Sequence, residues 1–201
     1  MSDSTTHSDT ALFDAFWKLV AEQGWRRLSL HTLASEAGMT LAELRAKVSH
    51  KGALPCLFSR SVDEAVLRGA PASVSGTARD RLFDVLMHRI DALQPHRAGI
   101  IRLGREMRTD PVLTLMLAPQ LAASMAWMLE AARIDAGGLT GAMRVQGLCG
   151  VWIATLRAWE QDESTDLGHT MAGLDKALDR AERLARSLRL DTEEAEAGPA
   201  V

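Results

Sequence analysis

The side chains that perform chemistry in enzymes and metal sites form no ordered pattern in this chain. Its six histidines lack the spacing of metal ligands, and its two cysteines, Cys56 and Cys149, are too few for a multi-cysteine zinc cluster or a disulfide framework. Cys149 falls on an apolar helix face, where a thiol acts as a small core side chain. The sequence also lacks the signatures of dinucleotide, nucleoside-triphosphate, zinc-protease and serine-hydrolase sites. We therefore expect no catalytic residue, no metal site and no cofactor, and a binding protein rather than an enzyme.

The charge balance limits the partners of the chain. With 23 Lys and Arg against 26 Asp and Glu, its 201 residues carry a net charge of −3. This argues against a basic coat for nucleic acid but allows a small DNA-reading patch. The first ten residues are polar and lack the apolar segment of a signal peptide. Together with the low cysteine content, this favours a reducing, cytoplasmic compartment.

A segment without charge runs from Pro111 to Leu129. A membrane-spanning helix needs about 20 predominantly apolar residues, whereas polar side chains and Pro119 interrupt this segment. We predict two buried helices instead, at 111–118 and 119–134, and no transmembrane segment. Contact with a membrane surface is the alternative.

The fold class follows from periodicity. Apolar side chains recur at three- and four-residue steps, and no segment alternates with the period of a β-strand. Gly24 ends the first helix, Ser29 caps a short second helix, and Thr40 with Glu43 forms a capping box for a third. A fourth helix follows over about 53–67. The sequence predicts an all-α protein.

The C-terminal two-thirds contains further helix signals. Thr77 and Asp80 form another capping pair, Asp110 before Pro111 marks a helix start, and Gly137 precedes the last two helices. The final helix carries a heptad-like apolar seam: Leu167, Met171, Leu174, Leu178, Ala181, Ala185 and Leu188. Such a seam suits packing against long helices at a shallow angle. We predict that the last two helices pair with their two-fold mates in a four-helix bundle.

Composition indicates the domain boundaries. Gly, Pro and Ser cluster in the uncharged segment 69–76, and residues 190–201 carry acids but no base. The expected parts are a flexible N-terminus (1–9), a three-helix helix-turn-helix domain (10–50), a connecting helix (51–69), a loop (70–76), a larger helical ligand-binding and dimerisation domain (77–189) and a flexible acidic tail (190–201).

Within residues 11–68, a helix-turn-helix pattern is visible. The small Ala34 lets two helices cross closely, and Gly38 provides a left-handed turn residue. These residues, with Leu33, Ala37, Met39, Thr40, Leu44, Val48, Lys51 and Leu54, match the signature positions of a known family. The segment resembles the DNA-binding domain of the tetracycline-repressor (TetR) type of transcriptional regulators. That resemblance implies a second motif helix that lies in the major groove.

Three positions depart from this signature. Leu41 stands where the family usually has a small or basic residue, Arg45 where it has an aromatic, and Glu43 where threonine is common. Arg45 and Lys47 either hold phosphates or read guanine, and Leu41 and Ala46 can touch thymine methyl groups. Glu43 either caps its own helix or turns a carboxylate toward phosphates. The resemblance implies these DNA-binding residues: Arg27, Ser29, Thr40, Leu41, Glu43, Arg45, Lys47 and Lys51. Residues 1–69 hold eight Lys and Arg and eight Asp and Glu, a weak balance for binding DNA.

A second, fainter resemblance covers residues 81–185. Trp127, the acidic run 162–166, Thr170 and Leu174 are similar to positions in TetR-fold proteins that bind isoprenoid lipids in ubiquinone biosynthesis. That family has lost DNA binding and presents lipids to a partner hydroxylase. It also has an amphipathic membrane helix near its C-terminus, where this chain has an acidic tail.

Both resemblances imply an apolar cavity in the C-terminal part. Methionines adapt to irregular ligands, and the residues expected to line the cavity are Met107, Met116, Met125, Trp127, Met128, Met143 and Trp152. Plain core packing is the alternative for each of them. The sequence therefore predicts a homodimeric TetR-like transcriptional regulator that binds operator DNA and is modulated by a hydrophobic small molecule or lipid. The alternative is a TetR-fold isoprenoid-lipid-binding protein without DNA binding.

Overall fold

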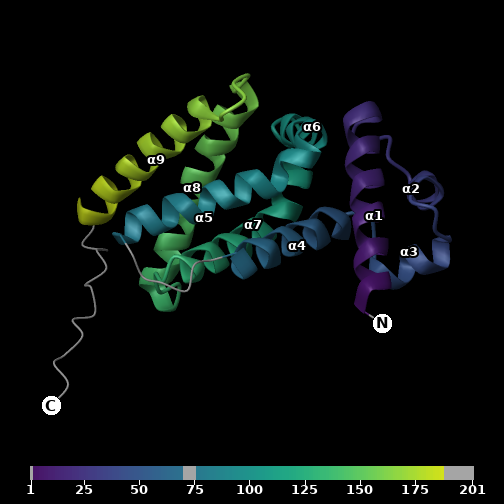
Figure 1. Ribbon diagram of the computed structural model, residues 1–201, viewed down its shortest axis with the longest axis horizontal. Coiled ribbons are helices and arrows are strands. Elements are labelled where there is room, and N and C mark those ends of the chain that lie inside the picture. Colours follow the sequence, from purple (N-terminus) through teal and green to yellow (C-terminus); the bar gives the residue numbers. More distant parts are fainter. Residues whose placement is uncertain (1, 70–75, 188–201) are drawn as a thin grey trace, which may run out of the picture. The chain divides into compact units, whose positions relative to one another are not determined.

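The computed structural model describes residues 2–69 and 76–187, and the side chains of residues 9–69 and 76–187 (Figure 1). These residues form helices and connecting turns without a strand, which confirms the all-α class. The α-helices are α1 (Ser2–Gln23), α2 (Leu30–Glu36), α3 (Leu41–Lys47), α4 (Ala53–Gly69), α5 (Ala78–Leu93), α6 (Arg97–Met107), α7 (Pro111–Ala131), α8 (Gly138–Gln161) and α9 (Gly168–Ser187), with a 3-10 turn η1 (Gln94–His96).

The chain divides into two compact units. One comprises residues 1–68 and 89–121, and the other comprises residues 69–88 and 122–201. The helices α5 and α7 each contribute to both units. Most of the expected loop at 70–76 and the whole expected acidic tail lie outside the described residues. The segment 2–9, expected as a flexible N-terminus, continues α1 instead.

Capping signals predicted from the sequence are present where the structure describes them. Gly24 has φ +81° and ends α1. Asp110 accepts a hydrogen bond from the backbone N–H of Leu113 at 3.0 Å, which starts α7 at Pro111. Before α5, the Asp80 carboxylate accepts from the Thr77 N–H at 3.0 Å, so this pair caps the helix as expected. The caps at Asp110 and at the Thr77–Asp80 pair satisfy backbone N–H groups that the start of a helix leaves free.

The core of the first unit is built on α1. Leu12, Phe16 and Val20 are fully buried on one face of that helix. Helix α6 approaches closely at Gly99, where a Cβ atom would lie 2.5 Å from the Trp17 carbonyl oxygen. No larger residue fits there without moving α1 or α6, so Gly99 determines how near the two helices pack.

Two further contacts join α4 to this core. The Phe58 ring of α4 packs edge-on against Trp17 of α1 at 5.0 Å between centroids, a favoured aromatic geometry. Asp63 of α4 forms a buried ion pair with Arg89 of α5, and the Arg89 guanidinium also donates to Ser59 Oγ at 3.3 Å. The additional donor satisfies part of the charge that burial removes from water.

The second unit is organised around α8 and α9, which lie side by side (Figure 1). Gly173 of α9 faces Ala158 of α8 so closely that a Cβ atom on the glycine would lie 2.5 Å from the alanine Cβ. The buried positions of α9 are Thr170, Leu174, Ala177 and Leu178. This close contact uses the inner face of α9 within one chain.

The predicted seam on the last helix is therefore partly wrong. Leu167 precedes α9 with φ +58°, and Met171 is exposed, whereas Thr170 and Ala177 are buried. The inner face follows the 3.6-residue period of a helix that begins at Gly168 and packs on α8 in the same chain, and Leu174 and Leu178 belong to that face. Leu188 lies outside the described residues.

The predicted break at Pro119 is wrong, because α7 runs from Pro111 to Ala131 through the proline. Pro119 removes only the hydrogen bond to the carbonyl of Leu115, and Leu115 is 76% exposed, so water can replace that bond. Buried side chains continue on both sides of the proline, from Leu117 to Met125. Packing of these side chains stabilises the helix despite the hydrogen bond that is lost at Pro119.

Among the described helices, α7 is also the one long and apolar enough to cross a membrane by length and composition. A third of its most apolar window is buried inside the structure. The prediction that this segment is buried is therefore only partly right, since Val112 and Leu115 are each 76% exposed.

The loop between α8 and α9 supplies a stability test. The buried Asp162 carboxylate accepts hydrogen bonds from the Thr170 N–H at 2.7 Å and the Ser164 N–H at 3.0 Å, and from both hydroxyls. The hydrogen bonds from Ser164 and Thr170 hold the pKa of Asp162 well below its usual range. A lowered folded-state pKa contributes stability above the unfolded-state pKa, and this contribution is lost as the pH falls toward the folded-state value.

We therefore expect Asp162→Asn to lower the melting temperature at pH 7, by about 3–6 °C. The deficit relative to the unmodified chain should remain constant near neutral pH and shrink below about pH 4. Thermal denaturation followed by circular dichroism measures both effects. Glu163→Gln, at the exposed neighbouring position, is the matched control and should change little. An equal deficit for the two variants would show that the Asp162 network does not stabilise the loop.

Candidate nucleic-acid interface

A helix-turn-helix is formed by α2, a tight turn and α3. The Ser29 hydroxyl accepts from the Thr32 N–H at 3.0 Å and caps α2. Gly38 adopts φ +65° in the turn, and the Met39 N–H donates back to the Ala34 carbonyl at 2.9 Å. Such a conformation carries little steric cost only for glycine. The turn predicted from the sequence is confirmed. It changes the direction of the chain so that α3 packs against α2.

The inner face of α3 is fixed by a small apolar core. Leu33 and Ala34 of α2 are buried with Leu44 of α3 and Val48, which follows α3. These contacts leave the opposite face of α3 in solvent. The exposed residues there are Leu41, Ala42, Arg45 and Ala46, with Leu41 50% exposed. Their spacing of one and four residues places them on one side of the helix.

Glu43 is turned away from this exposed face by the capping box. Its Oε2 atom accepts from the Thr40 N–H at 2.7 Å and from the Thr40 hydroxyl at 2.8 Å. The Thr40 hydroxyl in turn accepts from the Glu43 N–H at 3.2 Å. The backbone hydrogen bond from Thr40, reinforced by the hydroxyl, lowers the pKa of Glu43. The carboxylate is therefore ionised but held at its own helix start, which resolves the two readings that the sequence left open.

Two of the expected phosphate-binding cations are engaged inside the chain. Lys47 Nζ lies 2.5 Å from the Asp9 carboxylate, on the segment of α1 that the sequence treats as flexible. Lys51 Nζ donates to the Trp25 carbonyl at 2.5 Å and lies 4.6 Å from the centre of the indole ring. Burial lowers the pKa of Lys51, and Glu106 opposes this. Both ammonium groups therefore already have partners within the chain.

Arg27 and Arg45 are exposed, and no hydrogen bond or ion pair within the described residues engages either of them. Of the eight residues predicted to bind DNA, Leu41 and Arg45 lie together on the exposed face of α3. Ser29 and Thr40 serve as helix caps. Ala42 and Ala46 share this face of α3. Ala42 was not among the residues expected there, and its helical spacing from Leu41 and Arg45 is the signal for it.

The motif is anchored by a carboxylate that sequence reasoning missed. Glu106 of α6 accepts from the Trp25 N–H at 3.1 Å and from Arg102 Nε at 3.3 Å. Nearby, Arg26 donates to the Asp110 carboxylate at 3.3 Å. A shallow polar depression surrounds these contacts, lined by Glu22, Gln23, Arg26, Arg27, Arg102, Glu106 and Thr109. The connection from α1 to α2 is therefore tied to α6 through Glu106 and to the start of α7 through Asp110.

The residues expected to bind a ligand are distributed over the two compact units. Met125, Met128 and Trp152 are buried in the second unit, whereas Trp127 and Met143 of that unit are 56% and 41% exposed. Met107 and Met116 belong to the first unit, where Met116 packs beside Gly52. Helical spacing explains why Trp127 is exposed while its neighbours are buried. On α7, Trp127 lies on the side of the helix away from Met125 and Met128.

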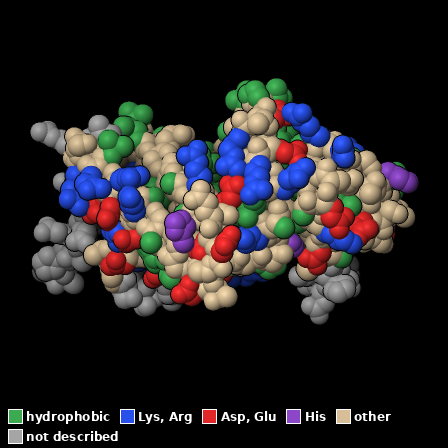
Figure 2. Space-filling view, turned by 90° about the horizontal axis from the view of Figure 1, so that it is seen from above, with side chains coloured by type: hydrophobic (Ala, Val, Ile, Leu, Met, Phe, Trp, Pro, Cys, Tyr) green, Lys and Arg blue, Asp and Glu red, His purple; other side chains and the backbone are tan. Residues whose placement is uncertain are grey.

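Charges of both signs mix over the surface. Figure 2 shows Lys and Arg side chains interspersed with Asp and Glu on the face that it draws, in agreement with the net charge of −3. Among the described residues, no group of three or more His, Cys, Asp or Glu side chains could hold a metal ion.

Two solved structures share this fold. The TetR transcriptional regulator from Nitrosomonas europaea ATCC 19718 superposes with a TM-score of 0.68 and 21% sequence identity, over 87% of this chain and 98% of that one. A TetR transcriptional regulator from Rhodococcus sp. RHA1 gives a TM-score of 0.58 and 18% identity, over 89% and 96%. No protein-family model and no curated protein sequence matches the chain. The fold is thus of the TetR type, as the helix-turn-helix signature predicted.

The turn after α1 gives a second stability test. Gly24 has φ +81°, and a Cβ atom placed there would collide with Glu106 Oε1. Gly24→Ala should therefore lower the free energy of unfolding by at least about 1–2 kcal/mol, the cost of the left-handed conformation alone. Urea titration measures the change. Gly104→Ala is the matched control, because Gly104 lies in the interior of α6 with open space around it; that variant should gain about 0.5–1 kcal/mol. Equal effects at the two positions would contradict the proposed constraint.

Proposed function

We propose that this chain is a cytoplasmic transcriptional regulator that binds operator DNA as a homodimer and responds to a hydrophobic small ligand. The observation that carries the proposal is the exposed face of α3, which the motif core holds rigidly while Leu41 and Arg45 remain in solvent. In a helix-turn-helix, the second helix enters the major groove and its exposed side chains meet base edges. Two solved structures of the same fold are titled as transcriptional regulators, which supports this use of the motif.

The outer face of α8 supports dimerisation. Exposed residues follow a heptad spacing along this helix: Leu139, Met143, Gln146, Gly150, Ile153 and Arg157. Three of them are large and apolar, and Gly147 and Gly150 have open space where a Cβ would be. Glycines allow a second helix to approach closely, and an apolar heptad stripe is a typical helix-pairing surface.

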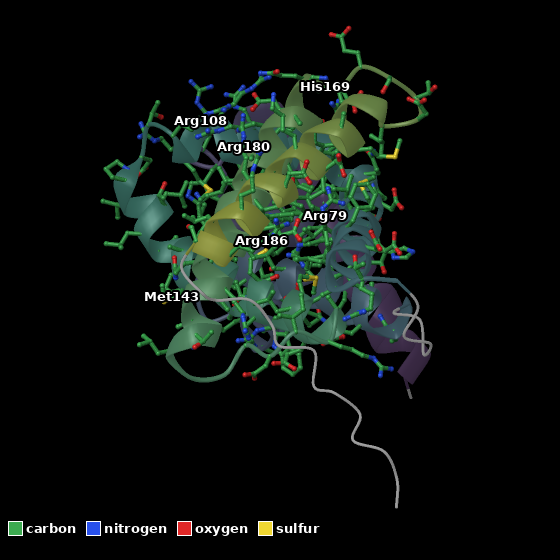
Figure 3. The ribbon with its side chains drawn as sticks, turned by 90° about the vertical axis from the view of Figure 1, so that its left-hand side faces the viewer. Arg79, Arg108, Met143, His169, Arg180 and Arg186 are labelled. Atoms are coloured by element: carbon green, nitrogen blue, oxygen red, sulfur yellow. The ribbon has the colours of Figure 1, made fainter. Side chains whose placement is uncertain are left out.

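The exposed face of α9 contributes to the same interface in this proposal. Figure 3 looks onto α9, with Arg180 and Arg186 along the helix, Arg79 beside it and Met143 on α8. Leu184 is 58% exposed on α9. Charged side chains on this face form ion pairs. The Arg79 guanidinium lies 2.6 Å from both the Asp175 and the Asp179 carboxylate. We infer that α8 and α9 pair with their two-fold mates and place two α3 helices for a palindromic site.

For the ligand, the buried Met125, Met128 and Trp152 are the residues with which a hydrophobic molecule would compete for space. Methionine side chains repack at low cost because they are unbranched and flexible. A ligand that binds one conformation better than another shifts the population toward that conformation. We infer that such a ligand changes DNA affinity by this route.

One observation favours the second candidate, an isoprenoid-lipid-binding protein of the same fold without DNA binding. Lys47 and Lys51 are engaged by Asp9 and Trp25, and residues 1–69 have no net charge. Phosphate contacts by cations supply most non-specific affinity for DNA. A protein with two of its cations withdrawn therefore binds DNA weakly unless base contacts compensate.

A substitution in α1 distinguishes the two functions. Asp9→Asn removes the partner of Lys47 and should tighten binding to the DNA upstream of the chain's own gene. If Lys47 then reaches one phosphate in each subunit, log affinity should fall more steeply with log salt, by about 2 for a dimer. Fluorescence anisotropy at two or more salt concentrations measures both quantities.

Lys47→Gln in the Asp9→Asn background should reverse the gain. Asp14→Asn is the matched control, since Asp14 is an exposed carboxylate of the same helix near His96 rather than α3. If none of these proteins binds the upstream DNA at low salt, the regulator function is wrong and the lipid-binding candidate takes its place.

The dimer surface has its own test. Ile153→Asp should convert the dimer to monomers at micromolar concentration, because a carboxylate would be buried without a partner at the proposed interface. Sedimentation velocity measures the mass. Leu115→Asp, at a more exposed apolar position on α7, should leave the dimer intact. A monomeric unmodified chain, or an Ile153→Asp variant that remains dimeric, would contradict the assignment to α8 and α9.

A further inference from the structure

We infer that each α3 reads one guanine next to thymine methyl groups in the major groove, an inference that rests on the proposed function. The exposed α3 face consists of three apolar side chains and one arginine: Leu41, Ala42, Ala46 and Arg45. Arg45 is the one side chain on this face that can form hydrogen bonds with a base. The face can therefore distinguish only those base pairs that an arginine or an apolar side chain recognises.

The other polar side chains of α3 are occupied. Glu43 would accept from the amino group of cytosine, but its carboxylate is held by Thr40. The Thr40 hydroxyl both donates to Glu43 and accepts from it. Lys47 is paired with Asp9 at 2.5 Å and its side chain is 22% exposed. The helix contains no Asn or Gln, the residues that pair with adenine.

Arg45 therefore carries the polar readout. It lies one turn after Leu41 on the exposed side of α3, and no carboxylate within the described residues forms a salt bridge with it. A guanidinium is a planar fork of donors that matches the O6 and N7 acceptors of guanine in the major groove. No other base offers two acceptors in this arrangement on its major-groove edge.

The apolar side chains of α3 disfavour neighbouring bases that present a hydrogen-bonding group in the major groove. Leu41 lies in the first turn of α3 and is half exposed, with Ala42 and Ala46 beside Arg45 on the same side. The C5 methyl group of thymine is the apolar feature of the major groove. Placing these side chains against an amino group would leave a donor without a partner, whereas a thymine methyl loses only its contact with water.

The test begins with selection of binding sequences from a random DNA pool by the full-length chain. The enriched site is then synthesised with single base analogues. Replacing guanine by 7-deazaguanine removes N7, and replacing thymine by uracil removes the methyl group. Affinity is measured by fluorescence anisotropy for the unmodified chain and for three variants of α3: Arg45→Ala, Leu41→Ala and Lys47→Gln.

One guanine in each half-site should lower affinity about tenfold when it is replaced by 7-deazaguanine. Uracil at an adjacent thymine should lower affinity about threefold. Arg45→Ala should lose the response to 7-deazaguanine and keep the response to uracil, and Leu41→Ala should do the reverse. Lys47→Gln is the control and should keep both responses, because Lys47 is assigned to no base.

Enrichment of a site that tolerates both analogues would overturn this inference while leaving DNA binding in place. A response to 7-deazaguanine that persists in Arg45→Ala would assign the guanine to another residue and overturn it equally. A pool that shows no enrichment, with no binding at low salt, contradicts the proposed function itself and the inference with it.

Discussion

The turn after α1 is the constraint on which the arrangement of the helix-turn-helix depends. At Gly24 the backbone enters the left-handed region, and Glu106 accepts from the N–H of the next residue, Trp25. A side chain at Gly24 would collide with that carboxylate. The left-handed turn and its acceptor together set the direction in which the chain leaves α1 for α2.

The consequences of this turn extend to the surface of α3. Trp25 is buried, and its carbonyl and ring hold Lys51 in the turn before α4. The core of Leu33 and Leu44 then fixes α3 with its opposite face in solvent. The exposure of Arg45 is thus a result of packing that begins two helices earlier, and a rigid support of this kind is what a precise reader of base edges needs.

Several charged side chains of the motif form hydrogen bonds or ion pairs within the chain. Glu43 caps its own helix, Lys47 pairs with Asp9, and Arg26 pairs with Asp110. Exposed pairs of this kind contribute little to stability. Their larger effect is on binding, because a cation that already has a partner releases fewer counterions when it meets DNA. In the proposed function, the affinity of this surface for DNA depends on direct contacts with bases more than on net charge.

The sequence by itself determined several helix ends, because caps and left-handed turns act within a few residues. Gly24, Gly38, the Thr40–Glu43 box and the Thr77–Asp80 pair are all visible in it. It also determined the all-α fold and the helix-turn-helix, since the spacing of apolar residues and the position of the turn glycine predict both. Only the tertiary structure decided that α7 continues through Pro119 and that Leu174 and Leu178 face α8 in the same chain. It alone paired Lys47 with Asp9 and Lys51 with Trp25, residues 38 and 26 positions apart. Contacts over such distances depend on how whole helices pack, and no local pattern of residues encodes that packing.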